Sequence, residues 1–162
     1  MASNRHLGRI VALQALYEYD FRLRSGDASV DIEEITARNV YRYKDTIDDI
    51  DFVEQLIRGV AKNFDALDAR LQPLAPEWPL AQISRIDHGI LRLSLYELFD
   101  MPESKIPSKV TINEAVELAK SFGAENSSKF INGVLGSAWR KEHPDDTSLN
   151  PVSKVSASKE EK

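Results

Sequence analysis

Apolar side chains recur at steps of three and four residues along most of the chain, which is the period of an amphipathic α-helix. The first such stretch covers residues 4–23 and ends before a turn that begins at Ser25. A weaker helix is expected over residues 31–43 and a stronger one over 50–71. The aspartates between residues 45 and 51 favour a helix start, because carboxylates suit the positive end of the helix dipole.

The middle of the chain combines breakers with its most apolar stretch. Three prolines interrupt residues 73–79, and a short helical turn is expected at 79–83. Residues 84–100 carry apolar side chains on more than one side, which is typical of a central helix that others surround.

Two more helices are expected near the end. The stretch from Thr111 to Glu114 has the capping-box pattern, so a helix should begin there and run to about Ser121. Gly123 is then expected to close it as a left-handed C-cap. The last helix should begin near Asn126 and end near Lys141.

These patterns predict an all-α fold, because no segment shows the sustained alternation of a strand. We expect a compact bundle of about seven helices in one domain over residues 1–142. Beyond His143 the chain is polar, so residues 143–162 are predicted to be a disordered tail.

Composition narrows the class of protein. Hydrophobic residues make up 42% of the chain, which is enough for a folded core, and no apolar run approaches the ~20 residues of a membrane span. Cysteine is absent, so disulfides and zinc–thiolate sites are excluded. With no signal-peptide pattern at the N-terminus, we expect a cytoplasmic protein that does not enter a membrane.

The net charge of −5 argues at first against nucleic acid, but the charges are unevenly distributed. Basic groups outnumber acidic ones in residues 1–24 and 120–141, and acidic groups predominate between them. If the two ends of the chain lie together in the fold, they form a basic patch on an acidic body. The alternative is that these are ordinary fluctuations of surface charge.

No pattern of catalysis is present. The chain lacks glycine-rich phosphate-binding loops, and no calcium-loop spacing surrounds its aspartates. His6, His88 and His143 lie in separate segments without zinc-ligand spacing. We therefore expect no enzyme and neither a metal nor a cofactor.

Basic and aromatic residues point instead to RNA binding. Arg5 and Arg9 are one helical turn apart and share a face, with Tyr17 two turns further along the same helix. Guanidinium groups donate in pairs to phosphates, and an exposed tyrosine stacks on an unpaired base.

A second group of such residues precedes and opens the last helix. Phe122 and Phe130 lie beside Lys120 and Lys129, and this mixture suits single-stranded RNA because cations follow the backbone while rings stack on bases. The alternative is that Tyr17, Phe122 and Phe130 belong to the core.

Three stretches resemble the NusB family of transcription antitermination factors, in the same order and at similar spacing over residues 4–140. They are RIVALQALY (Arg9 to Tyr17), IDHGILRLSLYEL (Ile86 to Leu98) and VTINEAVELAKSFGAENSSKFINGVL (Val110 to Leu135). The resemblance implies two helical subdomains. It also implies pairing with NusE, a small-subunit ribosomal protein, binding to boxA RNA, and entry into an RNA polymerase antitermination complex on ribosomal RNA operons.

The resemblance also implies site residues. The RNA-binding candidates are Arg5, Arg9, Tyr17, Lys120, Phe122, Asn126, Lys129 and Phe130. Asp87 corresponds to an acidic position that faces the ribosomal protein. The family often has a dense run of arginines at its N-terminus, whereas this chain has two there, Arg5 and Arg9. Where the family's F-G-A-E-D-S motif has Asp, this chain has Asn126. We therefore expect weak RNA binding without a partner.

Two other functions fit the same sequence. A ribosomal RNA methyltransferase carries a domain of this fold, but its catalytic half would have to follow, and here a polar tail is expected. A helical module that binds only protein is the other alternative. It predicts that Tyr17 and Phe122 are buried and that no basic surface joins the two chain ends. Pairing of two copies into a homodimer is also possible on either reading.

Overall fold

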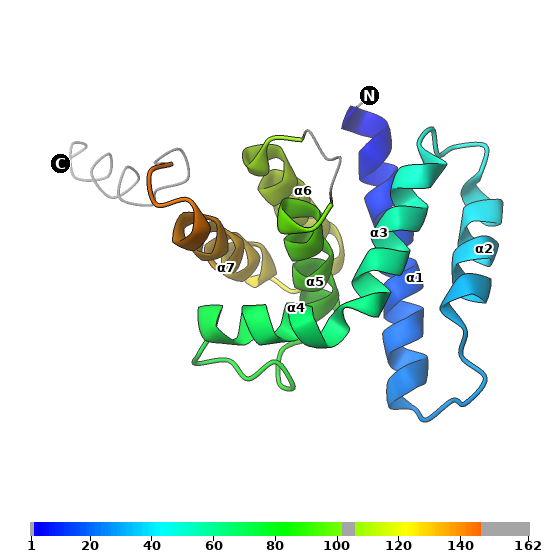
Figure 1. Ribbon diagram of the computed structural model, residues 1–162, viewed down its shortest axis with the longest axis horizontal. Coiled ribbons are helices and arrows are strands. Elements are labelled where there is room, and N and C mark those ends of the chain that lie inside the picture. Colours follow the sequence, from blue (N-terminus) through cyan, green and yellow to red (C-terminus); the bar gives the residue numbers. More distant parts are fainter. Residues whose placement is uncertain (1, 102–105, 147–162) are drawn as a thin grey trace.

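The computed structural model describes residues 2–101 and 106–146. These residues form seven α-helices and one short 3₁₀ turn and contain no β-strand, which confirms the all-α prediction (Figure 1). Part of the expected loop, residues 102–105, and most of the expected tail, residues 147–162, lie outside the described residues.

The first three helices form one group. They are α1 (Ala2–Arg24), α2 (Ile32–Tyr43) and α3 (Ile50–Lys62), and each contacts the other two. The starts of α2 and α3 are fixed by aspartates: the Asp31 carboxylate accepts the Glu33 N–H at 3.0 Å, and Asp49 accepts the Phe52 N–H at 3.0 Å. The expected helices over 4–23 and 31–43 are confirmed.

The single helix expected over residues 50–71 is wrong. The chain bends at Asn63, and α4 (Phe64–Leu71) follows as a separate helix. The Asn63 side-chain amide donates to the Gly59 carbonyl at 2.7 Å, and its backbone has non-helical angles of φ −119° and ψ 22°. A short polar side chain thus competes with the helical bonding pattern, which apolar spacing alone does not reveal.

The proline-containing segment also differs from the prediction. A 3₁₀ turn occupies Gln72–Leu74, whereas residues 79–83 contain only a turn closed by the bond from Gln82 N–H to the Pro79 carbonyl. Hydrogen bonds of the Gln72 side chain take the place of helical backbone hydrogen bonds there. Its amide donates to the carbonyls of Ala75 and Trp78 and accepts the Leu80 N–H.

Helix α5 (Arg85–Phe99) occupies the centre of the fold. It contacts α1, α3, α4, α6 and α7, and both of its sides contain buried residues. The Ser84 hydroxyl caps its start by accepting the Asp87 N–H at 3.1 Å. The predicted central helix is therefore confirmed.

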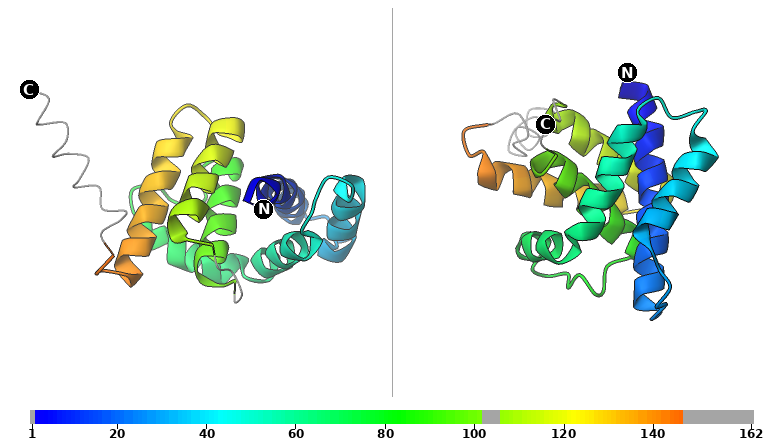
Figure 2. Two further views of the ribbon diagram at one scale, coloured as in Figure 1. Left: turned by 90° about the horizontal axis from the view of Figure 1, so that it is seen from above. Right: turned by 45° about the vertical axis from the view of Figure 1, so that its right-hand side comes forward.

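Helices α6 (Ser108–Phe122) and α7 (Ser127–Glu142) pack side by side against α5 (Figure 2). The predicted capping box is wrong, because α6 begins one turn earlier and Thr111 is buried inside it. The predicted left-handed cap at Gly123 is also wrong, since its φ is −92°. A side chain at Gly123 would instead meet Ser127 and the Ala119 carbonyl at less than 3 Å, so close packing explains the glycine.

The helices thus form two subdomains, α1–α3 and α4–α7, as the family resemblance implied (Figure 1). Helix α5 joins them by packing on both α1 and α3. Buried charges reinforce this contact: Arg92 of α5 bonds to Asp68 of α4 and lies 3.4 Å from Asp20 of α1. The guanidinium of Arg92 also stacks on the Phe64 ring at 3.8 Å.

Candidate nucleic-acid interface

The turn between α6 and α7 carries an exposed aromatic ring beside two cations. Phe122, the last residue of α6, leaves 41% of its surface accessible, and Lys120 and Lys129 are exposed on either side of the turn. Lys120 lies 3.5 Å from Glu117 in an exposed pair that binding to a phosphate could readily replace. The turn therefore presents the combination of ring and charge that single-stranded RNA requires.

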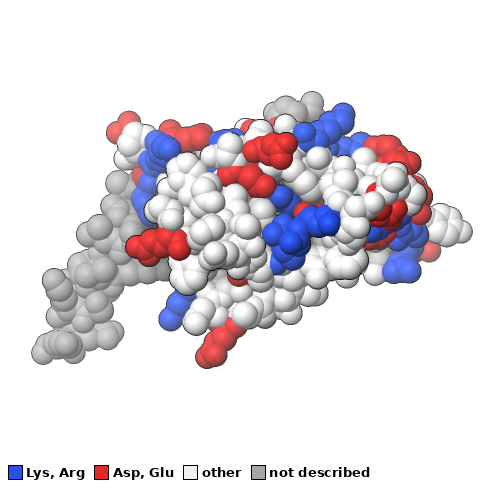
Figure 3. All heavy atoms as spheres, turned by 90° about the horizontal axis from the view of Figure 1, so that it is seen from below, with Lys and Arg blue, Asp and Glu red and all other residues white. Residues whose placement is uncertain are grey.

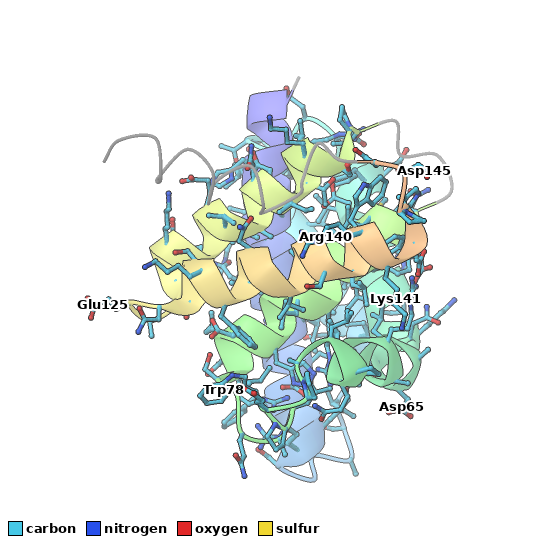
Figure 4. The ribbon with its side chains drawn as sticks, turned by 90° about the vertical axis from the view of Figure 1, so that its left-hand side faces the viewer. Asp65, Trp78, Glu125, Arg140, Lys141 and Asp145 are labelled. Carbon is cyan, nitrogen blue, oxygen red and sulfur yellow. The ribbon has the colours of Figure 1, made fainter. Side chains whose placement is uncertain are left out.

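A groove adjoins this turn between α7 and the segment before α5. Its volume is about 670 Å³, and its walls include Trp78, Asp87, Asn126, Lys129 and Phe130. The Trp78 ring meets the Phe130 ring edge-on at 6.5 Å. Figure 4 shows Trp78 below the N-terminal half of α7, with Glu125 at the start of that helix.

Trp78 was missed as a site residue from the sequence. Its ring is 56% exposed, although tryptophan is usually largely buried. It also lines a second hollow of about 460 Å³ together with Phe130 and Val134. The proline-rich context of Trp78 was a signal for a loop that carries an exposed ring, but spacing could not place that loop against α7.

The carboxylate of Asp87 connects the groove to the turn. Its Oδ2 accepts the Ser127 hydroxyl at 3.0 Å, and the same hydroxyl accepts the Ala124 N–H at 2.9 Å. The other oxygen, Oδ1, is buried and receives no hydrogen bond from the residues that the structure describes. Asp87 therefore both lines the groove and holds the start of α7.

Tyr17 lies at this same end of α5. Its ring is 42% exposed and borders a small hollow with Arg85 and Gly89 of α5. Phe21, one turn further along α1, is more exposed still. The possibility that Tyr17 and Phe122 belong to the core is therefore wrong, whereas Phe130 is half-buried and shares in both core and groove.

Arg5 lies about 18 Å from Tyr17 along α1, as twelve residues of helical rise require. Its guanidinium bonds to Asp49 at 3.2 Å and covers the Phe52 ring at 4.6 Å, and it stays partly exposed. The neighbouring His6 bonds to Glu114 in the first half of α6. The N-terminal end of α1 therefore lies beside α6, well away from the α6–α7 turn.

The structure corrects the prediction that Arg9 shares an exposed face with Arg5. Arg9 is only 2% exposed, and its Nε donates to Glu97 Oε2 at 2.9 Å. A second bond runs from Arg9 Nη2 to Glu97 Oε1, and Glu114 lies 3.6 Å from the guanidinium. The spacing of residues along a helix does not show whether an arginine is exposed or is buried in an ion pair.

The basic patch expected from the chain ends is not formed as a single surface. Arg5 lies at one end of α1, and Lys120 and Lys129 lie near the α6–α7 turn. On the face seen in Figure 3, basic and acidic side chains are interspersed among uncharged ones. Exposed rings and a groove, rather than one joined basic surface, therefore characterise this site.

The described residues contain no cluster of three or more histidine, cysteine or carboxylate side chains that could hold a metal ion. No helix among them has the length and apolar character needed to cross a bilayer.

Comparison with known proteins identifies the family. The profile described as the NusB family matches residues 6–140. A transcription antitermination protein NusB from Dehalococcoides mccartyi (strain CBDB1) is 41% identical over 137 residues, which cover 85% of this chain and 90% of the relative. The protein of that name from Chloroflexus aggregans is 39% identical, with 84% and 87% covered.

Solved structures agree with the fold. T. maritima NusB superposes with a TM-score of 0.71 at 34% identity, covering 83% of this chain and 89% of its own. A crystal structure of antitermination factors NusB and NusE in complex with dsRNA contains a chain with a TM-score of 0.72 at 22% identity, covering 87% and 99%. Both relatives are named as transcription antitermination proteins. On the profile match and these identities, the chain belongs to the NusB family.

Proposed function

We propose that this chain is a cytoplasmic RNA-binding antitermination factor that acts with NusE. It binds boxA-type single-stranded RNA in nascent ribosomal RNA and joins the RNA polymerase antitermination complex. The observation that carries the proposal is the exposed Phe122 ring beside Lys120 and Lys129 at the α6–α7 turn. A ring stacks on an unpaired base while the cations follow the backbone.

Besides the turn, the proposed RNA surface includes two separate positions, Tyr17 beside the start of α5 and Arg5 near the N-terminal end of α1. Asn126 supports it, because an uncharged amide at the start of α7 avoids repelling a phosphate. Few cations are available, so binding by this chain alone should be weak and only moderately salt-dependent. A solved complex of NusB and NusE with dsRNA supports the idea that a NusE partner can be present on the same RNA and supply further contacts.

The proposed partner surface is the groove around Asp87. An apolar side chain from the partner would pack in the groove against the paired rings of Trp78 and Phe130, and a hydrogen-bond donor beside it would meet the carboxylate. The groove thus suits a protein, while the neighbouring turn suits RNA. The two surfaces adjoin at Asn126 and Lys129, so a joint protein–RNA complex is geometrically consistent.

The test is fluorescence anisotropy of a labelled boxA-type RNA, titrated with the chain alone, with NusE alone and with both. Salt is varied from about 50 to about 200 mM, because phosphate contacts release counterions. We expect the mixture to bind more tightly than either protein, and a scrambled RNA of the same composition to bind less well. No binding by the mixture would overturn the proposal. Binding of NusE by the chain, with no binding of RNA by the mixture, would support the protein-only alternative instead.

A further inference from the structure

The start of α7 is held by one hydroxyl. Ser127 is only 4% exposed, and its Oγ accepts the Ala124 N–H from within the turn while donating to Asp87 on α5. Asn126, at the N-cap position, makes no side-chain capping bond. Ser127 is therefore the side chain that ties the α6–α7 turn to another helix.

Close packing leaves the turn little freedom. A Cβ at Gly123 would lie 2.7 Å from the Ser127 Oγ and 2.8 Å from the Ala119 carbonyl oxygen. Such distances require the turn to shift, and Phe122 is the residue immediately before it. Phe122 therefore directly precedes a closely packed turn in which Gly123 and Ser127 lie against each other.

Asp87 in turn has its own orientation fixed. Its backbone N–H donates to the Ser84 hydroxyl at the start of α5, the central helix that five other helices contact. One carboxylate oxygen accepts the hydrogen bond of the Ser127 hydroxyl, and the other receives no hydrogen bond from the described residues. A buried carboxylate oxygen without a donor is uncommon in native structures and calls for an explanation.

We propose that Asp87 is a positioning residue for RNA binding: through Ser127 it holds the α6–α7 turn in the conformation that presents Phe122 and Lys129. The same carboxylate faces the groove proposed for the partner, so one side chain serves both surfaces. This inference rests on the proposed function, because it concerns how the RNA site is held. It adds to Asp87 a role that does not depend on contact with the partner.

Three variants separate the two roles of this carboxylate. Ser127→Ala removes the bond to Asp87 but leaves the carboxylate in place. Asp87→Asn removes the charge but keeps an oxygen that can accept the Ser127 hydroxyl. Asp87→Ala removes both. Ser128→Ala, one residue further on, is the matched control because its side chain takes no part in this network.

RNA affinity is measured at saturating NusE, and NusE affinity is measured separately without RNA. We expect Ser127→Ala and Asp87→Ala to weaken RNA binding on the order of tenfold, as loss of a hydrogen bond to a charged group implies. In contrast to Asp87→Ala, Asp87→Asn should bind RNA nearly as tightly as the unaltered chain. Ser127→Ala should weaken NusE binding less than Asp87→Ala does, because it leaves the carboxylate in the groove, and Ser128→Ala should leave both affinities unchanged.

Amide hydrogen exchange of the free chain gives a readout that needs no RNA. Exchange at Ala124 should accelerate in Ser127→Ala, while amides in the middle of α5 stay protected. If the unaltered chain with NusE binds no RNA, the proposed function and this inference both fail. If it binds RNA and the folded Ser127→Ala variant binds equally well, the positioning role alone is wrong. Failure of Asp87→Asn to restore RNA affinity would also overturn it.

Discussion

Arg9 of α1 and Glu97 of α5 form a buried ion pair in which the guanidinium donates to both oxygens of the carboxylate. The Arg9 guanidinium also lies 5.4 Å from the Phe52 ring centroid of α3. These contacts join the first subdomain to the central helix at a point that solvent does not reach. Arg9 therefore stabilises the arrangement of the helices, and it has no free donor surface for RNA.

The first prediction is that Arg9→Ala lowers the free energy of unfolding by about 3–5 kcal/mol, because the Glu97 charge is left buried without its partner. Urea unfolding followed by circular dichroism measures this. Arg5→Ala is the matched control, since its pair with Asp49 is partly exposed and its loss should cost at most about 1 kcal/mol. An Arg9→Ala protein that is fully stable but fails to bind RNA would show that this guanidinium reaches the nucleic acid.

The second prediction concerns the Phe122 ring. Phe122→Ala should weaken RNA binding by about 1–3 kcal/mol, as the loss of one base-stacking ring implies, with little change in stability because the ring is exposed. Tyr41→Ala is the control, because Tyr41 is an exposed aromatic residue on α2. Equal losses of RNA affinity in the two variants would argue against a specific stacking site at the turn.

The third prediction uses salt to count phosphate contacts. Lys129→Gln should reduce the slope of log affinity against log salt concentration by about 1, because one counterion fewer is released. Lys62→Gln, at an exposed position on α3, should leave the slope unchanged. If Lys129→Gln lowers affinity equally at every salt concentration, the ammonium does not contact a phosphate.

The fourth prediction is a pH dependence of stability. Burial by itself raises the pKa of the Asp68 carboxyl, but hydrogen bonds from Arg92 and His88 outweigh it and lower that pKa to about 2. Because the folded pKa lies below the unfolded one, this carboxylate contributes its stability above about pH 4 and loses it as the pH falls toward 2.

The Asp68→Asn variant tests this assignment. It should lower the free energy of unfolding at pH 7 by about 2 kcal/mol, and the difference from the unaltered chain should shrink as the pH falls from 4 to 2. Chemical unfolding at a series of pH values measures both quantities. A difference that stays constant over this range would mean that Asp68 titrates normally in the folded protein.

Most of the fold follows from apolar spacing, and the errors have physical causes. The helices over 4–23, 31–43 and 84–100 were predicted because each buries a continuous face. The break at Asn63 and the early start of α6 depend on single hydrogen bonds and on packing between helices. Neither a single side-chain bond, such as that of Asn63 to Gly59, nor packing between helices leaves an apolar period in the sequence.

The site was predictable in part, chiefly through the resemblance to the NusB family. Tyr17 and Phe122 are exposed as an RNA surface requires, but the burial of Arg9 depends on Glu97, which is 88 residues away in the chain. Trp78 was missed because its role depends on a loop folding back against α7. Contacts such as Arg9 with Glu97 and Trp78 with Phe130 join distant parts of the chain, so they are seen only in the folded structure.

The most direct test of the RNA site is photocross-linking with boxA-type RNA that carries 4-thiouridine, in the presence of NusE. Cross-linked peptides are identified by mass spectrometry, with the scrambled RNA as control. We predict cross-links in the peptide that spans Phe122 to Phe130, and their loss in Phe122→Ala. Cross-links confined to α2 and α3, with none at the α6–α7 turn, would contradict the account.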